Sequence, residues 1–476
     1  MPREEVFFFC SSCGHETAKW IGQCPGCGEW NTFVEAPRAR SAPPGGAARP
    51  PRRPSAAPVP VAEAAAAMTE RVRCGDPGVD RVLGGGLVPG SLVLLAGEPG
   101  IGKSTLLLQV AALLARTTSP ALYVSAEESA RQVALRARRI GAADRNVLLL
   151  AETSAEATLA GLGESEPAVI VVDSVQTVAS DDVASPAGSP SQVRQVAAVF
   201  QRVAKERGVP VVLVGHVTKE GSIAGPKLLE HLVDVVLSLE GEPGHDLRVL
   251  RATKNRFGTV AELALYAMTG GGLEAVSNPS AWLLEDRRSG APGSVVTVAL
   301  EGTTPLLAEV QALVSPSFLA TPRRVAQGVD GSRLALLLAV LERHTELSFS
   351  DRDVFVNLVG GLALREPALD LAVTAAVISS TVDRPLPSDL AVFGEVGLLG
   401  EVRAVSRAAD RVREAAALGF GRVALPARDA SDRLGLPAVP VATVSDLSKL
   451  LVRSGVRTTT GTRGRGEDAE IGDHPD

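Results

Sequence analysis

The sequence lacks several features that would place it in other protein classes. None of its apolar runs reaches the roughly 18 residues that a membrane-spanning helix requires, and Phe7–Phe9 is too short for the core of a signal peptide. Five cysteines in 476 residues argue against a disulfide scaffold. Basic residues are not in excess, because 48 Lys and Arg against 54 Asp and Glu give a net charge of −6. We therefore expect a cytoplasmic chain without membrane association, in which any contact with nucleic acid comes from local loops or from an assembled channel.

The length predicts about three domains, each large enough to bury its own core. Changes in composition mark the boundaries: Pro, Ala, Arg and Gly dominate a stretch after the first cysteines, and Gly, Thr and charged residues dominate the C-terminal end. We expect an α/β protein made of a four-cysteine finger (1–34), a disordered linker (35–67), a large α/β domain (68–275), a second α/β domain (280–452) and a disordered tail (458–476).

Four of the cysteines form two CxxC pairs near the N-terminus. Ten residues separate the pairs, and each pair is followed by a glycine that permits a tight turn around a metal. Four thiolates make a closed, tetrahedral Zn²⁺ site without an open position for chemistry. A redox-active pair is the alternative, and the same thiolates also accept Fe²⁺. The predicted zinc ligands are Cys10, Cys13, Cys24 and Cys27, whereas Cys74 has no partner in the sequence and is expected to be a small, partly buried side chain.

A glycine-rich loop follows the apolar run 91–96 and opens a helical stretch. This order of strand, loop and helix forms a phosphate cradle, because the glycines let backbone N–H groups converge on phosphate oxygens. A glycine turn at the surface is the alternative. In the predicted site Lys103 reaches the β- and γ-phosphates of ATP, and Ser104 holds Mg²⁺. The expected nucleotide-binding residues are Gly97, Glu98, Pro99, Gly100, Ile101, Gly102, Lys103, Ser104 and Thr105.

Three polar positions stand at the ends of later apolar strands. A carboxylate beside the phosphate loop can orient the attacking water, and we favour Glu127 over Glu128 for this role, with a helix-terminal charge as the alternative. Asp173 fits the residue that binds Mg²⁺ through water. His216 is either a sensor of the γ-phosphate or an uninvolved histidine.

These motifs occur together in one known family. The four-cysteine finger, the phosphate loop, the strand ending at Asp173 and the segments Gly215–Lys219 and Lys254–Gly258 stand in the order and spacing of that family. From Phe7 to about Leu451 the chain resembles the RadA (Sms) family of bacterial DNA repair proteins. The pentapeptide Lys254–Gly258 is the most diagnostic piece.

The resemblance implies a RecA-like P-loop ATPase core that assembles into a hexameric ring. The resemblance also implies that the ring binds single-stranded DNA in its channel. It implies that the ring acts alongside the recombinase RecA on branched recombination intermediates and promotes their branch migration. Lys254 and Arg256 are expected beyond the core strands, as a cationic finger that reaches the nucleotide of a neighbouring subunit, with an exposed basic turn as the alternative. The expected catalytic residues are Lys103, Glu127, Asp173, Lys254 and Arg256.

Two polar segments are candidates for the channel loops, Ser180–Gln192 and Lys219–Lys227. We expect the first to contain no core residues. Neither has the alternating aromatic residues that base stacking requires. We therefore expect contacts to the DNA backbone from the two lysines that bound the second segment.

The second α/β domain resembles the peptidase domain of Lon proteases, notably at Gly394–Val402. Lon uses a serine and a lysine of lowered pKa, but here these positions hold Ala368 and Ala409. Because a methyl group neither attacks a carbonyl nor moves a proton, we expect a platform for assembly or DNA contact and no peptidase activity. Four arginines recur just after this stretch: Arg403, Arg407, Arg411 and Arg413. We expect them either to form a basic surface or to lie on ordinary solvent-exposed faces of the domain.

The leading hypothesis is therefore a DNA-dependent ATPase motor of recombinational repair that uses ATP, Mg²⁺ and Zn²⁺. A nucleotide-switched binding module without motor action is the alternative, and an ATP-driven peptidase is contradicted by the two alanines. Ring size, polarity, the preferred DNA structure and the partner of the finger do not follow from the sequence.

Overall fold

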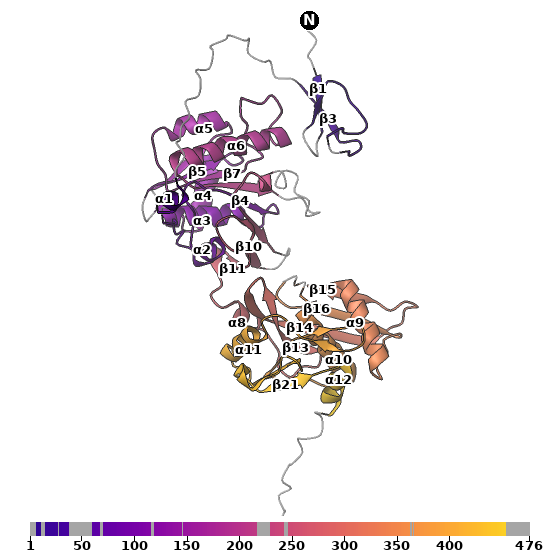
Figure 1. Cartoon of the computed structure of the whole chain (residues 1–476). Helices are drawn as coiled ribbons and strands as arrows, with labels where there is room; N and C mark the ends of the chain where they lie inside the picture. The colour runs from indigo at the N-terminus through magenta and orange to yellow at the C-terminus, as the bar shows by residue number, and fades with distance from the viewer. Residues whose placement is uncertain are drawn as a thin grey trace, which may run out of the picture. The chain divides into compact units, whose positions relative to one another are not determined.

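A computed structural model describes the chain at residues 6–10, 15–26, 28–37, 60–66, 70–115, 119–144, 146–216, 229–241, 246–361, 364 and 366–453. The chain divides into two compact units (Figure 1): residues 1–282 with 300–304 and 360–362, and residues 283–299, 305–359 and 363–476. Among the described residues, no helix is long and apolar enough to cross a bilayer. Cys13, Cys27, the segment Lys219–Lys227 and the predicted tail lie outside the described residues.

The N-terminal segment forms a small antiparallel sheet in the order β2-β1-β3, built from β1 (Val6–Cys10), β2 (Glu16–Thr17) and β3 (Phe33–Pro37). Cys10, Cys24 and Phe33 are buried together at its centre. A domain of fewer than about 40 residues usually needs a metal, a disulfide or a partner in addition to its apolar core, which favours a metal in this segment.

The large domain is built on one sheet with the strand order β12-β11-β10-β9-β4-β8-β7-β5-β6. Six strands from β9 to β6 in this order are parallel to their neighbours, whereas β10, β11 and β12 continue the sheet in antiparallel fashion. The α/β class was predicted, whereas the antiparallel extension was not. The strands are β4 (Leu92–Gly97), β5 (Ala121–Ser125), β6 (Val147–Ala151), β7 (Val169–Asp173), β8 (Val211–His216), β9 (Val235–Glu240), β10 (Leu247–Asn255), β11 (Leu263–Thr269) and β12 (Gly272–Ala275).

Helices cover both faces of this sheet, which is why its central strands are apolar throughout. On one face the core is completed by α2 (Pro77–Leu83), α3 (Lys103–Ala115) and α4 (Ala130–Arg139). The other face is covered by α5 (Ala155–Leu162) and α6 (Pro190–Arg207). The predicted α/β class with a RecA-like core is confirmed.

Two predictions about irregular segments need correction. The linker predicted for 35–67 holds the end of β3 and the helix α1 (Val61–Ala66), because its Ala-rich end favours a helix. The segment Ser180–Gln192 is not free of core residues, since the Gln192 side chain is buried and donates to the carbonyls of Ser180, Val183 and Ser185. This loop is therefore held against the domain by buried hydrogen bonds.

The second unit contains a mixed sheet in the order β15-β16-β14-β13-β17-β20-β21. Its strands are β13 (Ser294–Glu301), β14 (Thr304–Pro316), β15 (Arg324–Gln327), β16 (Arg352–Leu358), β17 (Leu390–Val392), β20 (Arg422–Pro426) and β21 (Ala438–Val441), with β18 (Glu395–Val396) and β19 (Val402–Arg403) paired separately. The helices are α9 (Gly331–His344), α10 (Asp370–Val382), α11 (Ala408–Ala417) and α12 (Val444–Arg453), and short 3-10 turns span Pro367–Leu369 and Asp432–Leu434. The helix α8 (Pro279–Leu283) stands in the sequence where the first unit ends and the second begins.

The two positions of the missing dyad lie in different environments. Ala368 is buried in the turn Pro367–Leu369, directly before α10. Ala409 is exposed on α11. Neither position carries a nucleophile or a base, which removes peptidase chemistry from these two positions.

The predicted basic surface on this segment is wrong for Arg411. Its side chain is fully buried, pairs with Glu366 through two guanidinium nitrogens and donates to the carbonyl of Val298 at 2.6 Å. A buried guanidinium is retained only where its donors are satisfied, as they are here. The other three arginines form ion pairs with acidic neighbours: Arg403 with Glu401, and Arg407 and Arg413 with Asp410.

Candidate nucleotide-binding site

The glycine-rich loop connects the buried strand β4 to the first turn of α3, as predicted. Two glycines in it are sterically required. A Cβ at Gly97 would lie 2.6 Å from the carbonyl oxygen of Leu239, and Gly102 has a φ of +117°, a backbone conformation that residues with side chains rarely adopt. The loop can therefore stay close to the sheet and turn its backbone toward a ligand only without side chains at these positions.

Lys103 is buried under this loop. Its ammonium donates to the carbonyls of Gly97 and Glu98, both at 2.9 Å, and its Nζ lies 3.1 Å from Nδ1 of His216. Burial lowers the pKa of Lys103 to about 8, although the charges of Asp173 and Glu127 act in the opposite direction. The lysine is thus held in a place where added negative charge favours its protonated form.

Asp173 ends β7 beside the loop. It is buried and accepts a hydrogen bond of 2.5 Å from the hydroxyl of Tyr123, which lies inside β5. Burial, followed by the charge of Asp173, raises the pKa of Tyr123 well above its ordinary value, whereas a hydrogen bond with Ser104 lowers it. Ser104, Tyr123 and Asp173 therefore form a cluster of oxygen atoms, which are the ligands that Mg²⁺ prefers.

Glu127 and His216 meet at the carboxyl ends of β5 and β8, which lie on either side of β7 in the sheet. The register pairs Ser125 of β5 with Asp173 of β7, and Gly97 of β4 with His216 of β8, so these termini share one edge of the sheet. Nε2 of His216 lies 3.1 Å from the Glu127 carboxylate, which also accepts a hydrogen bond from the hydroxyl of Ser174. The chain of contacts runs from Lys103 through His216 to Glu127.

Glu128 has a different partner. Its carboxylate pairs with Arg136 of α4 at 2.6 Å. The neighbouring Ser129 caps α4 by accepting from the backbone N–H of Gln132. Glu128 is therefore engaged with the helix, whereas Glu127 faces the groups around the phosphate loop.

These side chains surround a cavity of about 350 Å³. The cavity is lined by most of the nucleotide-site residues that were predicted from the sequence and by several residues that were not predicted. The predicted ones are Pro99, Gly100, Gly102, Lys103, Ser104, Thr105, Glu127, Glu128, Asp173 and His216, and the missed ones are Ser125, Arg136 and Arg139. Arg248 of β10, also missed, donates to the carbonyl of Ile101 in the loop at 3.1 Å.

The position of the predicted cationic finger needs correction. Lys254 lies within β10, not beyond the core strands, and its ammonium donates to the carbonyls of Glu230 and Val233. Burial, followed by the charge of Arg256, lowers the pKa of Lys254. Arg256 follows the strand and pairs with Asp234 at 3.0 Å, but its side chain is 52% exposed. Of the two, Arg256 keeps the freer cationic group.

The described half of the four-cysteine site fits a metal. Cys10 and Cys24 are buried side by side, and the N–H of Gly26 lies 3.4 Å from the Cys24 sulfur. Gly28 adopts a φ of +77° and donates to the Cys24 carbonyl. Such a knuckle, with a backbone N–H directed at sulfur, suits a thiolate that ligates zinc. Cys74 lies elsewhere, buried in the core of the large domain, and burial raises the pKa of its thiol.

Comparison with known families agrees with both sites. The sequence model of the AAA domain matches residues 59–222, which include the phosphate loop, and that of a rubredoxin metal binding domain matches residues 8–35, which include all four cysteines. The predicted ATP-binding core and zinc-binding ribbon are thereby confirmed.

Curated relatives extend the comparison over nearly the whole chain. DNA repair protein RadA of Halalkalibacterium halodurans is 45% identical over 467 residues, which cover 97% of this chain and 100% of the relative. The chain belongs to the RadA family of DNA repair proteins. RadA of Pseudomonas aeruginosa is 50% identical over 90% of this chain and 94% of its own, and RadA of Escherichia coli K12 is 48% identical over 88% and 92%. Among solved structures, the RadB recombinase aligns with 43% of this chain and 100% of its own at 24% identity and a TM-score of 0.35.

Membership of the RadA family confirms the resemblance predicted from the motifs. The match includes the second unit, because the relatives cover 88% to 97% of this chain. The matches to the RadA family therefore extend beyond the ATP-binding core and the zinc ribbon into the second α/β unit.

Proposed function

We propose that the chain is a DNA-dependent ATPase of recombinational DNA repair. It binds single-stranded DNA, promotes branch migration of the branched intermediates made by RecA, and works in the cytoplasm as a hexameric ring. The observation that carries this proposal is the cavity in which Lys103, His216 and Glu127 are in contact beside Asp173. This arrangement joins a group that binds phosphate to a group that activates water.

The hydrolytic step uses groups that the sheet edge already brings together. Lys103 leaves the loop carbonyls and binds the β- and γ-phosphates, while the backbone N–H groups of the loop hold the remaining oxygens. Glu127, fixed by Ser174 and His216, orients the attacking water. Ser104 and Asp173 would hold Mg²⁺, whose chemistry is to neutralise the phosphate charge.

A charge from a second subunit would complete the site. Arg256 is the better candidate for this finger, because its side chain is half exposed whereas the ammonium of Lys254 is engaged with carbonyls of its own subunit. In this proposal Lys254 positions the end of β10 and Arg256 contacts the neighbouring nucleotide. Hydrolysis then depends on assembly, and a ring concentrates local basic groups that the acidic chain as a whole lacks.

Steady-state hydrolysis with and without single-stranded DNA tests the central claim, with Lys103→Ala as background. We expect DNA to raise the rate of ATP hydrolysis by the wild-type chain. We expect no ATP hydrolysis by Lys103→Ala, with or without DNA. The same preparation would then migrate a branched DNA substrate together with RecA. An unchanged rate with DNA would favour the nucleotide-switched binding module, and normal hydrolysis by Lys103→Ala would remove the assignment of the nucleotide site.

A mixing experiment tests the finger. Lys103→Ala subunits keep Arg256, and Arg256→Ala subunits keep an intact phosphate loop. If Arg256 acts on the neighbouring subunit, a mixture of the two inactive proteins regains activity. Lys254→Ala mixed with Lys103→Ala should show the same gain, because the Lys103→Ala subunit supplies a correctly positioned Arg256 to its neighbour. If the activity of the mixture equals the summed activities of the two variants measured separately, Arg256 either acts within its own subunit or has no role as a finger.

A further inference from the structure

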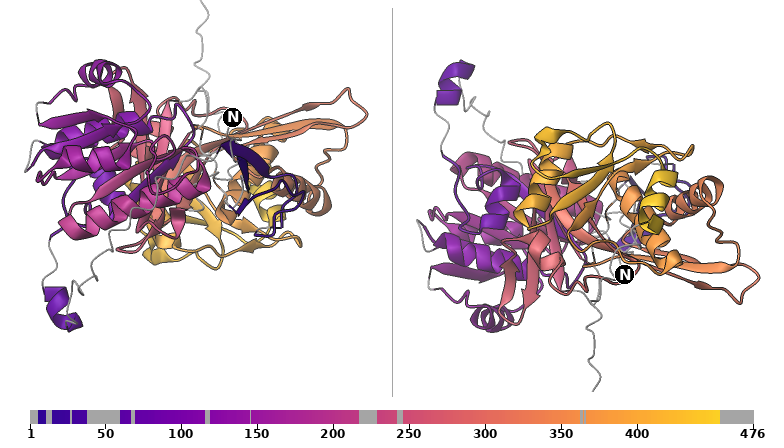
Figure 2. Two further views of the ribbon diagram at one scale, coloured as in Figure 1. Left: turned by 90° about the horizontal axis from the view of Figure 1, so that it is seen from above. Right: turned by 90° about the horizontal axis from the view of Figure 1, so that it is seen from below.

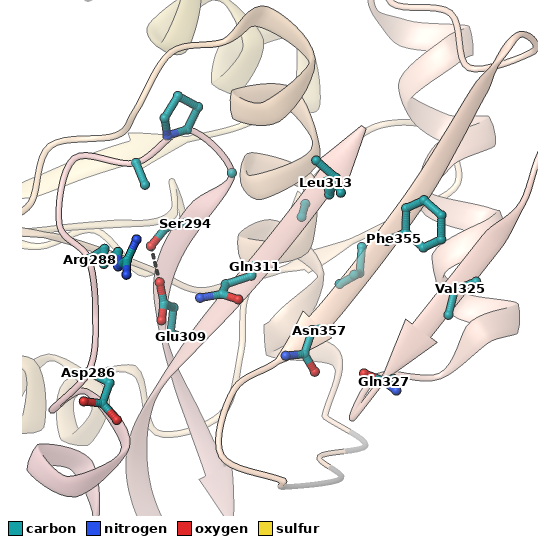
Figure 3. Close-up of a pocket in the computed structure, with 15 residues that line it drawn as sticks. Asp286, Arg288, Ser294, Glu309, Gln311, Leu313, Val325, Gln327, Phe355 and Asn357 are labelled. Atoms are coloured by element: carbon teal, nitrogen blue, oxygen red, sulfur yellow. Dashed lines mark hydrogen bonds between the residues drawn. The ribbon is translucent and has the colours of Figure 1, made fainter. Parts of the chain in front are cut away.

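A hydroxyl donates to a buried carboxylate in each of two cavities of the described chain. In the C-terminal unit Glu309 is 2% exposed and accepts from Ser294 in a cavity of about 600 Å³ (Figure 3). Arg288 lines that cavity and Arg287 interacts electrostatically with Glu309, so guanidinium groups balance this carboxylate. In the nucleotide-binding cavity the carboxylate belongs to Asp173, and there the hydroxyl donor is part of a longer chain of oxygen atoms.

The donor is Tyr123, a core residue of β5 with a polar end. Its side chain is fully buried, and the strand register pairs it with Val171 of β7. Because side chains alternate along a strand, Asp173 lies on the same face of the sheet as Val171, two residues nearer the phosphate loop. The helix α3, whose first turn carries Ser104, packs against this face, which the right-hand view of Figure 2 shows from the outside. The Tyr123 hydroxyl is therefore directed along this face toward the nucleotide site.

The hydrogen bonds at this hydroxyl have a defined direction. Tyr123 donates to Oδ2 of Asp173 at 2.5 Å, and an ionised carboxylate can only accept. A phenol has one hydrogen, so the hydrogen bond that links Tyr123 to Ser104 must be donated by the serine. The donors therefore follow one direction, from Ser104 through Tyr123 to Asp173.

This direction suits two side chains that serve a metal ion. A serine hydroxyl that coordinates Mg²⁺ presents an oxygen lone pair to the ion, so its hydrogen must point elsewhere. Tyr123 accepts that hydrogen, and its own bond leaves the second oxygen of the Asp173 carboxylate for the water around the ion. We infer that Tyr123 is a positioning residue of the Mg²⁺ site, which orients Ser104 and Asp173 toward the ion without being a ligand itself.

Packing alone would not require a hydroxyl at this position. A phenylalanine would fill the same apolar space, and a buried hydroxyl is favourable only where it is hydrogen-bonded. Side chains that hold metal ligands in place typically change metal affinity by about 10- to 100-fold when they are removed. Loss of the Tyr123 hydroxyl should therefore weaken Mg²⁺ binding. The inference rests on the assignment of Ser104 and Asp173 to Mg²⁺ in the proposed function and adds a residue to that site.

The chain offers a matched control for the Tyr123→Phe variant. Tyr266 of β11 is also fully buried, and its hydroxyl donates to the Asp76 carboxylate at 2.5 Å. Tyr266 is not among the described residues that line the nucleotide cavity. Tyr266→Phe therefore loses the same kind of buried hydrogen bond in the same domain but should leave the Mg²⁺ site intact.

Fluorescence titration of the full-length chain with mant-ADP measures nucleotide binding without hydrolysis. Each protein is titrated in EDTA and over a series of Mg²⁺ concentrations. In Tyr123→Phe the Mg²⁺ concentration for half-maximal binding should rise by on the order of tenfold, and in Tyr266→Phe it should equal that of wild type. In EDTA all three proteins should bind mant-ADP with equal affinity, because the Tyr123 hydroxyl acts through the ion.

The outcomes separate this inference from the function on which it rests. A wild type that binds mant-ADP equally well in EDTA and in Mg²⁺ removes the Mg²⁺ site of the proposed function, and the inference with it. A Mg²⁺-dependent wild type beside an unshifted Tyr123→Phe overturns the role of Tyr123 alone. An equal shift in Tyr266→Phe, or weaker binding by Tyr123→Phe in EDTA, also overturns it, because either result means a general disturbance of the domain.

A double-mutant cycle with Ser104→Ala gives a second measurement of the Mg²⁺ concentration for half-maximal binding. If Tyr123 acts through Ser104, the rise in the double variant is smaller than the product of the rises in the two single variants. A rise equal to that product would mean that the two side chains act independently and would contradict the inference. Circular dichroism of each protein checks that the variants are folded.

Discussion

The Nδ1 atom of His216 lies 3.1 Å from the ammonium of Lys103. The other ring nitrogen contacts Glu127, so one imidazole touches both the group proposed to bind phosphate and the group proposed to activate water. A nucleotide that draws Lys103 toward its phosphates must replace the contact between Lys103 and His216 with a contact between Lys103 and phosphate oxygens. The state of the phosphate site is thereby linked to the position of Glu127 through a single side chain.

The pKa of Lys103, which burial lowers to about 8, predicts that ATP binding takes up a proton. Phosphate oxygens favour the charged amine, so at pH 8 about half a proton is bound per nucleotide, and affinity falls as the pH rises further. Calorimetric titrations in two buffers of different ionisation enthalpy measure this uptake. Lys103→Arg is the matched control, because its guanidinium stays charged and should remove the uptake. Identical proton uptake in both proteins would assign it to another group.

The same shift affects stability without nucleotide, with a defined sign. Since the pKa in the folded chain is lower than the 10.5 of a free lysine, the unfolded chain binds the extra proton between about pH 8 and 10.5. The contribution of Lys103 to the free energy of unfolding therefore rises as the pH increases through this window and is constant below it. Comparing the pH dependence of urea unfolding for wild type and Lys103→Met isolates this contribution.

Glu127 and Glu128 are adjacent in sequence but should differ in function. Glu127→Gln keeps the side-chain volume and removes the carboxylate that contacts His216, so kcat should fall by on the order of 10²–10⁴ while ATP still binds. Glu128→Gln loses only the pair with Arg136 on α4 and should keep most of its activity. Rates of hydrolysis at saturating ATP decide between them. Equal losses in the two variants would contradict the assignment of the water-orienting role to Glu127.

Zinc retention should distinguish Cys10 from Cys74. Cys10 is buried in the N-terminal ribbon together with Cys24, and Cys10→Ser should lower the zinc content after dialysis against a chelator and leave residues 6–37 open to protease. Cys74→Ser should retain one zinc per chain, because its thiol lies in the apolar core of the ATPase domain. Elemental analysis of both proteins measures the difference. Full zinc in Cys10→Ser would show that this cysteine is not a ligand.

Much of the candidate site could be predicted because parallel strands end at one edge of a sheet. Asp173 and His216 end apolar strands, and Lys103 and Glu127 stand in the segments that follow β4 and β5, so all four were expected at one edge of the sheet. Tyr123 carried no such signal, since it lies within β5 and reads as an ordinary core residue until its hydroxyl is seen on Asp173. A strand pattern locates strand ends and does not report what a buried side chain contacts.

The errors have related causes. After Ala252 the residues are polar or basic, and nothing in this local pattern marks the residue at which β10 ends. Lys254 was therefore expected beyond the sheet, although it lies within β10. Arg411 was grouped with exposed arginines because charged residues are seldom fully buried. Its burial depends on the pair with Glu366 and on the hydrogen bond to the Val298 carbonyl. Long-range pairing of this kind is absent from local sequence patterns.

Arg411 and Arg413, two residues apart on α11, give a direct test of that pairing. Arg411→Ala leaves Glu366 without its buried partner and should destabilise the C-terminal unit by about 3–5 kcal/mol. Arg413→Ala removes a side chain that is 75% exposed and should have little effect, because its pair with Asp410 is at the surface. Hydrogen exchange of the peptides that cover α11 and β20 measures local stability in the full chain. Faster exchange confined to Arg411→Ala is expected, and equal protection in the two variants would mean that the Arg411–Glu366 pair does not stabilise this unit.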